Sequence, residues 1–80
     1  MAKIEPPEHL IELQRATNTA RAEATAGPYS AEAWRPWLEA AETVRIAVTE
    51  HAKEAGINRV DLEMAVKSAA RAAEAAQAEG

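Results

Sequence analysis

The chain has 80 residues, the length of one domain, and it contains 21 alanines, no phenylalanine and no cysteine. Disulfides and thiolate zinc sites are therefore excluded, and because a domain this small buries only about 60% of the surface of its unfolded chain, self-association is a candidate source of further burial. Nine basic residues against thirteen acidic ones give a net charge of −4, and no third of the chain is basic on balance, which disfavours nucleic acid as a partner.

Helix-forming residues dominate the chain between a few proline and glycine positions, at 6–7, 27–28, 36 and 56. No segment alternates β-branched with polar residues, as a half-buried strand would. Pieces of similar length joined by short turns favour antiparallel neighbours. The sequence therefore predicts an all-α fold, an antiparallel up-down-up three-helix bundle forming one domain over residues 1–80, with helices at about 7–26, 31–55 and 59–78.

The first helix is expected to begin at Pro7, because a proline at the first helical position loses no backbone hydrogen bond. It is expected to end near Ala26, since Gly27 can adopt the left-handed conformation of a helix cap and Pro28 cannot continue the helix. Its inward-facing residues, spaced by three or four, are Leu10, Leu13, Thr17, Ala20 and Ala24.

The second helix is expected to begin at Ala31 with Ser30 as its cap. Pro36 would clash with the carbonyl four residues earlier, so a break near residue 36 is expected. Gly56 should end this helix, and Ile57 should make the apolar contact that accompanies a glycine cap. The inward-facing residues are Ala41, Val44, Val48, Ala52 and Ala55, flanked by Trp34 and Leu38.

The third helix is expected to be capped by Asn58 and to persist through Ala78. Residues 69–78 contain seven alanines and no larger aliphatic residue, so this end must pack closely, find a partner or fray. The inward-facing residues are Leu62, Ala65, Val66, Ala69, Ala73 and Ala76.

The second turn of the chain resembles the turn of helix-turn-helix DNA-binding proteins. A small residue, the turn glycine, an aliphatic residue, a capping residue and a deeper aliphatic residue occur in that order, as Ala52, Gly56, Ile57, Asn58 and Leu62. The resemblance implies that residues 52–66 contain a recognition helix on which Asn58 and Arg59 contact DNA.

Three features depart from that motif. His51 replaces an aliphatic residue, the helix before the turn is about twice too long, and Asp61 and Glu63 would repel phosphates. Helix capping alone also selects the same residues at the turn of any helical hairpin. DNA binding is therefore kept as the alternative function.

All three aromatic residues, Tyr29, Trp34 and Trp37, fall at one helix junction. They can plug one end of a core that is short of volume, or they can anchor a partner. Both interpretations stay open, with the plug favoured.

The third helix carries a second face made of Val60, Met64, Lys67 and Arg71. Together with neighbouring alanines, this face would let another helix approach closely, so we expect a homodimer or a protein partner there. In the competing interpretation, Val60 and Met64 contact the first helix of the same chain.

Two His-x-x-Glu pairs, His9 with Glu12 and His51 with Glu54, are expected at the same end of the bundle. Their order differs from the Glu-x-x-His of di-iron bundles, and their carboxylates should be exposed. We therefore expect no metal and no cofactor.

The sequence offers little for catalysis, with only Ser30 and Ser68 as serines and no glycine-rich phosphate loop. A bundle of this size also has little room for a small-molecule substrate. No apolar run approaches the ~18 residues that span a bilayer, and the N-terminus lacks the apolar segment of a signal peptide. We therefore expect a cytoplasmic, non-enzymatic interaction or regulatory module, with a protein partner and no membrane contact.

Overall fold

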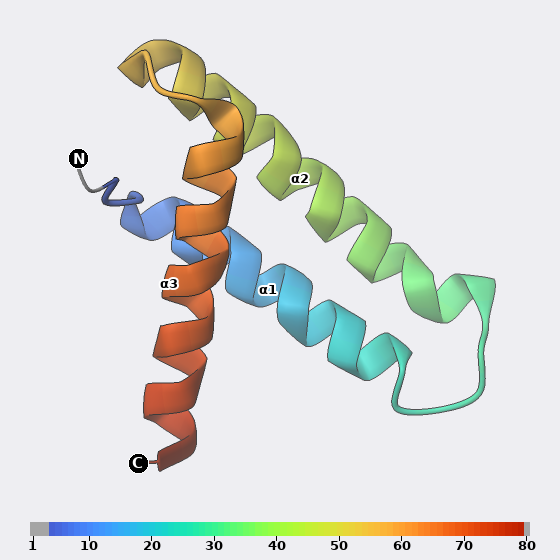
Figure 1. Cartoon of the computed structure of the whole chain (residues 1–80). Helices are drawn as coiled ribbons and strands as arrows, with labels where there is room; N and C mark the ends of the chain where they lie inside the picture. The colour runs from blue at the N-terminus through green and yellow to red at the C-terminus, as the bar shows by residue number, and fades with distance from the viewer. Residues whose placement is uncertain (1–3, 80) are drawn as a thin grey trace.

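A computed structural model describes residues 4–79, so residues 1–3 and 80 of the expected domain lie outside the described residues. Three helices follow one another along the chain: α1 (Glu8–Ala24), α2 (Ala31–Ala55) and α3 (Arg59–Glu79). No strand occurs between residues 4 and 79. The predicted all-α, three-helix bundle is confirmed (Figure 1).

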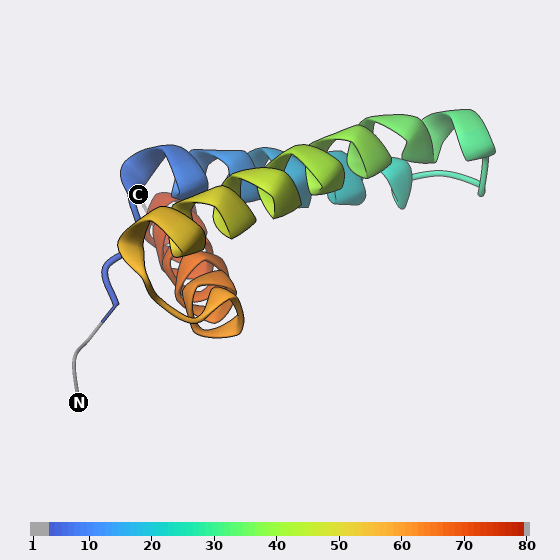
Figure 2. The ribbon, with the colours of Figure 1, turned by 90° about the horizontal axis from the view of Figure 1, so that it is seen from above.

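The bundle is flat and open. Its principal extents are 43 × 30 × 17 Å. Helices α1 and α2 form an antiparallel hairpin, whereas α3 runs obliquely across α1 and diverges from α2 after the turn that joins them (Figures 1 and 2). The N-terminal half of α2 therefore has no third helix beside it.

The core lies where the three helices meet, close to the α2–α3 turn. Leu10, Leu62 and Val66 are its largest fully buried side chains. Their burial removes several hundred Å² of apolar surface from water, which is the main stabilising contribution in a small domain. The remaining buried members of the cluster come from α2 and are Val44, Val48 and Ala52.

Most of the predicted inward-facing residues are buried or half-buried, including Leu10 and Ala24 near the two ends of α1. Ala55 and Ala76 are exposed, as is Leu38, which was expected beside the α2 stripe. Conversely, Gln14 and Ala70 are buried although neither belongs to a predicted stripe. Both changes follow from α3 packing on α1 to one side of the hairpin seam.

The alanine-rich end of α3 packs against α1. Ala70 is fully buried there, and its small side chain permits close approach of the two helices. Longer polar side chains bridge the same interface: Asn18 Nδ2 donates to Glu74 Oε1 at 2.8 Å, and the Arg15 guanidinium donates to the Gln77 side-chain oxygen. The sequence left three outcomes open for this end of α3, which were close packing, binding of a partner and fraying. The structure shows close packing against α1.

Three caps match the sequence expectations. Ser30 Oγ accepts a hydrogen bond from the N–H of Ala33 at 3.2 Å. Asn58 Oδ1 accepts from the second and third N–H groups of α3, at 2.8 and 3.2 Å. Gly56 ends α2 in the left-handed conformation (φ 69°), and Ile57 N donates to Ala52 O at 3.0 Å, which is the long hydrogen bond of a Schellman motif.

The expected ends of the first helix are wrong. Pro7 precedes the first helical residue and has an extended backbone, and α1 stops at Ala24. Thr25 follows in a right-handed conformation with φ −93°, and its hydroxyl donates to Arg21 O at 3.0 Å. A threonine hydroxyl thus satisfies a terminal carbonyl, and Gly27 does not adopt a positive φ.

The expected break near Pro36 is absent, because α2 is continuous from Ala31 to Ala55. Pro36 is close to the N-terminus of the helix, so the missing N–H removes a single hydrogen bond within its first two turns. The Ser30 cap and the burial of Val44 and Val48 farther along the helix stabilise α2 on both sides of that position.

Candidate functional site

A groove of about 290 Å³ lies between the α1–α2 hairpin and α3. It is lined by residues of all three helices, and the divergence of α3 from α2 leaves it open to solvent. No other described feature gathers polar, charged and aromatic side chains from every element, so the groove is the candidate functional site.

The floor of the groove is polar on its α1 side, and its hydrogen bonds are made internally. Thr17 Oγ1 donates to Leu13 O at 2.9 Å, and Gln14 Nε2 donates to Asn18 Oδ1 at 2.9 Å. Among the side chains of residues 4–77, every buried nitrogen or oxygen has a hydrogen-bond partner. The floor therefore offers no unpaired group around which a polar small molecule would be oriented.

The rim of the groove is cationic. Arg21 of α1, Arg45 of α2, and Arg59 and Lys67 of α3 line it, against the single carboxylate of Glu63. The groove thus carries +3 and the rest of the chain −7, which together make the net charge of −4.

Glu63 is shared between two of these cations. Its carboxylate lies 3.0 Å from Lys67 Nζ and 3.7 Å from Arg59 Nη1. One carboxylate cannot neutralise two cations, and all three side chains are substantially exposed. Such pairs contribute little to stability, so these cations are available to an incoming anionic group.

Arg45 is paired on its own helix. Its guanidinium donates to both carboxylate oxygens of Glu42, at 3.2 and 2.5 Å. These hydrogen bonds, and next the opposite charge, hold the pKa of Glu42 below its ordinary value and raise the pKa of Arg45. Because both groups are exposed to water, Arg45 can also exchange Glu42 for another carboxylate.

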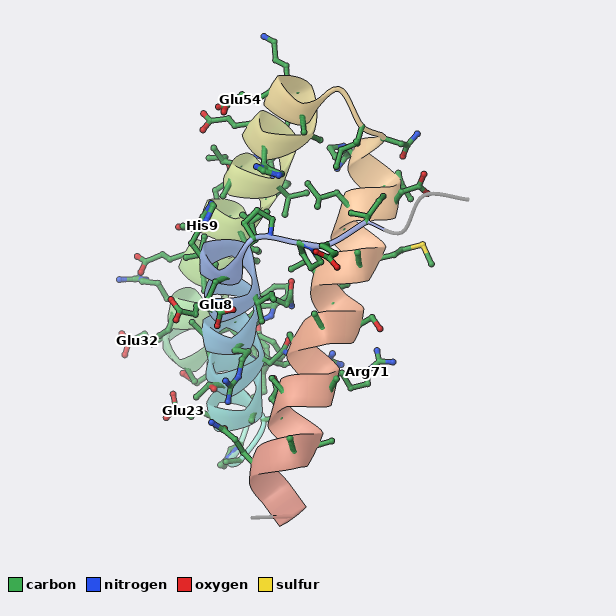
Figure 3. All side chains as sticks on the ribbon, turned by 90° about the vertical axis from the view of Figure 1, so that its left-hand side faces the viewer. Glu8, His9, Glu23, Glu32, Glu54 and Arg71 are labelled. Carbon is green, nitrogen blue, oxygen red and sulfur yellow. The ribbon has the colours of Figure 1, made fainter. Side chains whose placement is uncertain are left out.

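Three acidic residues lie on the opposite side of the molecule. Glu23, Glu32 and Glu54 project from the side of the hairpin that faces away from α3 (Figure 3). The fold thus brings four cations around one groove, although no third of the sequence is basic.

Exposed apolar side chains border the groove on two sides. Leu38 of α2 is 58% exposed, and Val60 and Met64 of α3 are 52% and 66% exposed. By helical spacing, Leu38 shares a face with the lining residue Arg45, and Val60 shares one with the lining residue Lys67, whereas Met64 lies farther from the groove. The interpretation in which Val60 and Met64 contact the first helix is wrong, because their exposure leaves them outside the core.

The predicted α3 face is exposed but divided. Lys67 lines the groove, whereas Arg71 projects from the side of α3 that faces away from the hairpin (Figure 3). By helical spacing, Val60 lies between these directions, whereas Met64 lies beyond Arg71, farther from the groove. Only the Lys67 edge of this face belongs to the groove.

The aromatic residues do not form one cluster of three. The rings of Trp34 and Trp37 meet edge to face with centroids 5.5 Å apart, and both are half-buried. Trp37 lines the groove, whereas Tyr29 is 81% exposed in the α1–α2 connection. Of the three aromatic residues, Trp37 thus contributes to the lining of the groove, and part of its surface stays exposed.

The residues proposed to read DNA have local partners. Asn58 Oδ1 is occupied by the two N–H groups that it caps. The guanidinium of Arg59 lies near Glu63. Both residues thus have a structural role at the start of α3, and DNA binding by residues 52–66 stays a prediction.

The two histidines lie at the same end of the hairpin, as expected. The rings of His9 and His51 meet edge to face with centroids 6.5 Å apart. No group of three or more histidine, cysteine, aspartate or glutamate side chains among residues 4–77 has an arrangement that could hold a metal ion. The two histidine rings make a packing contact.

Comparison with known proteins gives no further guide to the site. No protein-family model, curated protein or solved structure matches the chain. Within the described part of the chain, no helix is both long and apolar enough to span a bilayer.

Proposed function

We propose that the chain is a non-enzymatic protein-interaction module that binds another polypeptide through the groove and its apolar borders. One observation carries this proposal: two large exposed apolar residues, Leu38 of α2 and Val60 of α3, lie by helical spacing beside the groove-lining residues of two opposite walls. Exposed apolar side chains gathered around a concavity are typical of interaction surfaces rather than of isolated surface residues.

The chemistry of the groove supports binding over catalysis. Its lining contains no serine, cysteine or histidine, and its single carboxylate, Glu63, lies between two cations. The groove thus combines apolar contact area with charged groups that orient a partner, as interfaces do.

Site-specific photo-crosslinking tests the proposal. A benzophenone amino acid is placed at Leu38, beside the groove, and in a matched control at Ser68, which is exposed on α3. Irradiation in cells of the native host should yield a crosslinked protein from position 38 and not from position 68. Absence of any product from position 38, or the same products from both positions, would refute the proposal.

The same crosslinking experiment also tests self-association. A crosslinked product with the mass of two chains would identify a second copy as the partner. Light scattering over a range of concentrations provides an independent check, because a dimer formed through the groove must dissociate on dilution.

A further inference from the structure

The shape and charge of the groove together indicate what kind of polypeptide it accepts. Resting on the function proposed above, we propose that the groove receives an amphipathic helix of a partner protein whose apolar stripe is flanked by carboxylates. Three features of the groove support this proposal: its length, the absence of a helix between α2 and α3, and the positive charge of its lining.

The length of the groove matches a docked helix. Its lining on α2 extends from Trp37 to Val48, which is about 16 Å at 1.5 Å per residue. A bound helix presents apolar side chains at i, i+4, i+7 and i+11 over that distance. A volume of about 290 Å³ is just below the range of small-molecule pockets and is filled by a few inserted side chains.

The bundle lacks a helix where the groove lies. Helix α3 diverges from α2 (Figures 1 and 2). Trp37 and Ala41 are only half-buried in the lining of the groove, and Leu38 is exposed. A helix laid between α2 and α3 would cover these residues and complete a four-helix arrangement. Helical bundles bury apolar stripes in this way.

The charge of the groove selects an acidic helix. Cations stand on each of its three walls, with Arg21 on α1, Arg45 on α2, and Arg59 and Lys67 on α3. Carboxylates on both flanks of a docked helix would face opposite walls, whereas lysines there would meet like charges. Glu23, Glu32 and Glu54, on the side of the hairpin that faces away from α3, would repel the same helix and direct it to the groove.

The test uses two helical peptides as probes. Each is a stapled amphipathic helix of about four turns with leucine at i, i+4, i+7 and i+11. One has glutamate at every flanking position, and the other has lysine. Fluorescence anisotropy with the full chain should show that the glutamate peptide binds about tenfold more tightly at low salt, and that the difference shrinks at high salt.

Charge-reversal variants test whether the preference for the glutamate peptide arises in the groove. The double variant Arg21→Glu/Arg59→Glu should weaken the glutamate peptide about tenfold and strengthen the lysine peptide. The control Arg35→Glu/Lys53→Glu makes the same change in net charge at exposed positions outside the groove lining, and it should retain the preference. Circular dichroism checks folding, and Arg21→Gln/Arg59→Gln replaces the first variant if that variant is unfolded.

Several outcomes would overturn the inference. Equal affinity of the two peptides, a preference for lysine, or an equal effect of the control variant would each exclude recognition of acidic flanks by the groove. Tighter binding of a labelled DNA duplex, or a crosslinked dimer from position 38, would assign the groove to a different occupant. If neither peptide binds, the inference fails, and crosslinking at Leu38 then decides whether the proposed function fails with it.

Discussion

Two residues of α3 that are two positions apart face opposite environments, and their truncation tests how the helix is oriented. Leu62 is fully buried in the core, whereas Met64 is 66% exposed. We predict that Leu62→Ala lowers the free energy of unfolding by about 3 kcal/mol, within the range of about 2–5 kcal/mol for truncating a buried leucine. Met64→Ala should lower it by less than about 0.5 kcal/mol, as is usual for an exposed position.

The larger of these effects is a substantial part of the total. At about 0.05–0.15 kcal/mol per residue, a domain of this length has a free energy of unfolding of about 4–12 kcal/mol. A loss of about 3 kcal/mol should lower the Tm by about 12–24 °C, because each kcal/mol corresponds to about 4–8 °C in a domain of this size. Urea denaturation followed by circular dichroism measures both variants, and an unchanged m-value indicates that the unfolded state is the same.

The result that would refute this reasoning is a similar loss for both variants. Met64 would then face the core, α3 would be rotated about its axis, and the groove could not have the lining described. Measurement at two protein concentrations is the control. An effect of Met64→Ala that increases with concentration would show that Met64 is buried against a second copy.

Three further predictions concern single sites. Gly56→Ala should lower the free energy of unfolding by about 1–2 kcal/mol because φ is 69° there. Gly27 has open space around it and no positive φ, so Gly27→Ala should leave the free energy of unfolding unchanged or raise it by up to about 1 kcal/mol. Urea denaturation of the two variants compares these effects. Asn58→Ala should lower it by about 1 kcal/mol through loss of the cap, and Asn58→Asp should restore most of it. In an NMR titration, the pKa of Glu42 should lie below the ordinary value of a glutamate, and Arg45→Gln should raise it toward that value. Because the folded pKa of Glu42 is lowered, its contribution to stability is present above the unfolded pKa and is lost as the pH falls through the folded value.

The local signals that the sequence carries about helix boundaries were sufficient where a side chain makes the cap. Ser30 and Asn58 accept the hydrogen bonds expected of them, and Gly56 has the left-handed backbone that its position predicted. Gly27 and Pro36 carried equally strong local signals, but the glycine cap and the helix break expected from them do not occur. Thr25 ends α1 before the glycine, and packing farther along α2 outweighs the single hydrogen bond that Pro36 removes.

The candidate site could not be predicted from the sequence, for a different reason. Arg21, Arg45, Arg59 and Lys67 are distributed over three helices, and in each third of the chain acidic residues outnumber the basic ones. Only the oblique course of α3 brings these four side chains around one groove. The one local hint was the polar stripe of Gln14, Asn18 and Arg21, whose i, i+4, i+7 spacing marks a helix face beside the apolar one.

The oblique course of α3 has its own origin in the distribution of large and small residues. Leu62 and Val66 occupy the first two turns of α3 and fix it to the hairpin near the α2–α3 turn. Beyond them the inward positions are alanines, too small to reach across the seam between α1 and α2, so this part of α3 lies closely on α1 alone. Side chains of α1 then hold it there, through the Asn18–Glu74 and Arg15–Gln77 hydrogen bonds. The alanine excess that leaves the core thin is thus also what draws α3 away from α2 and opens the groove between them.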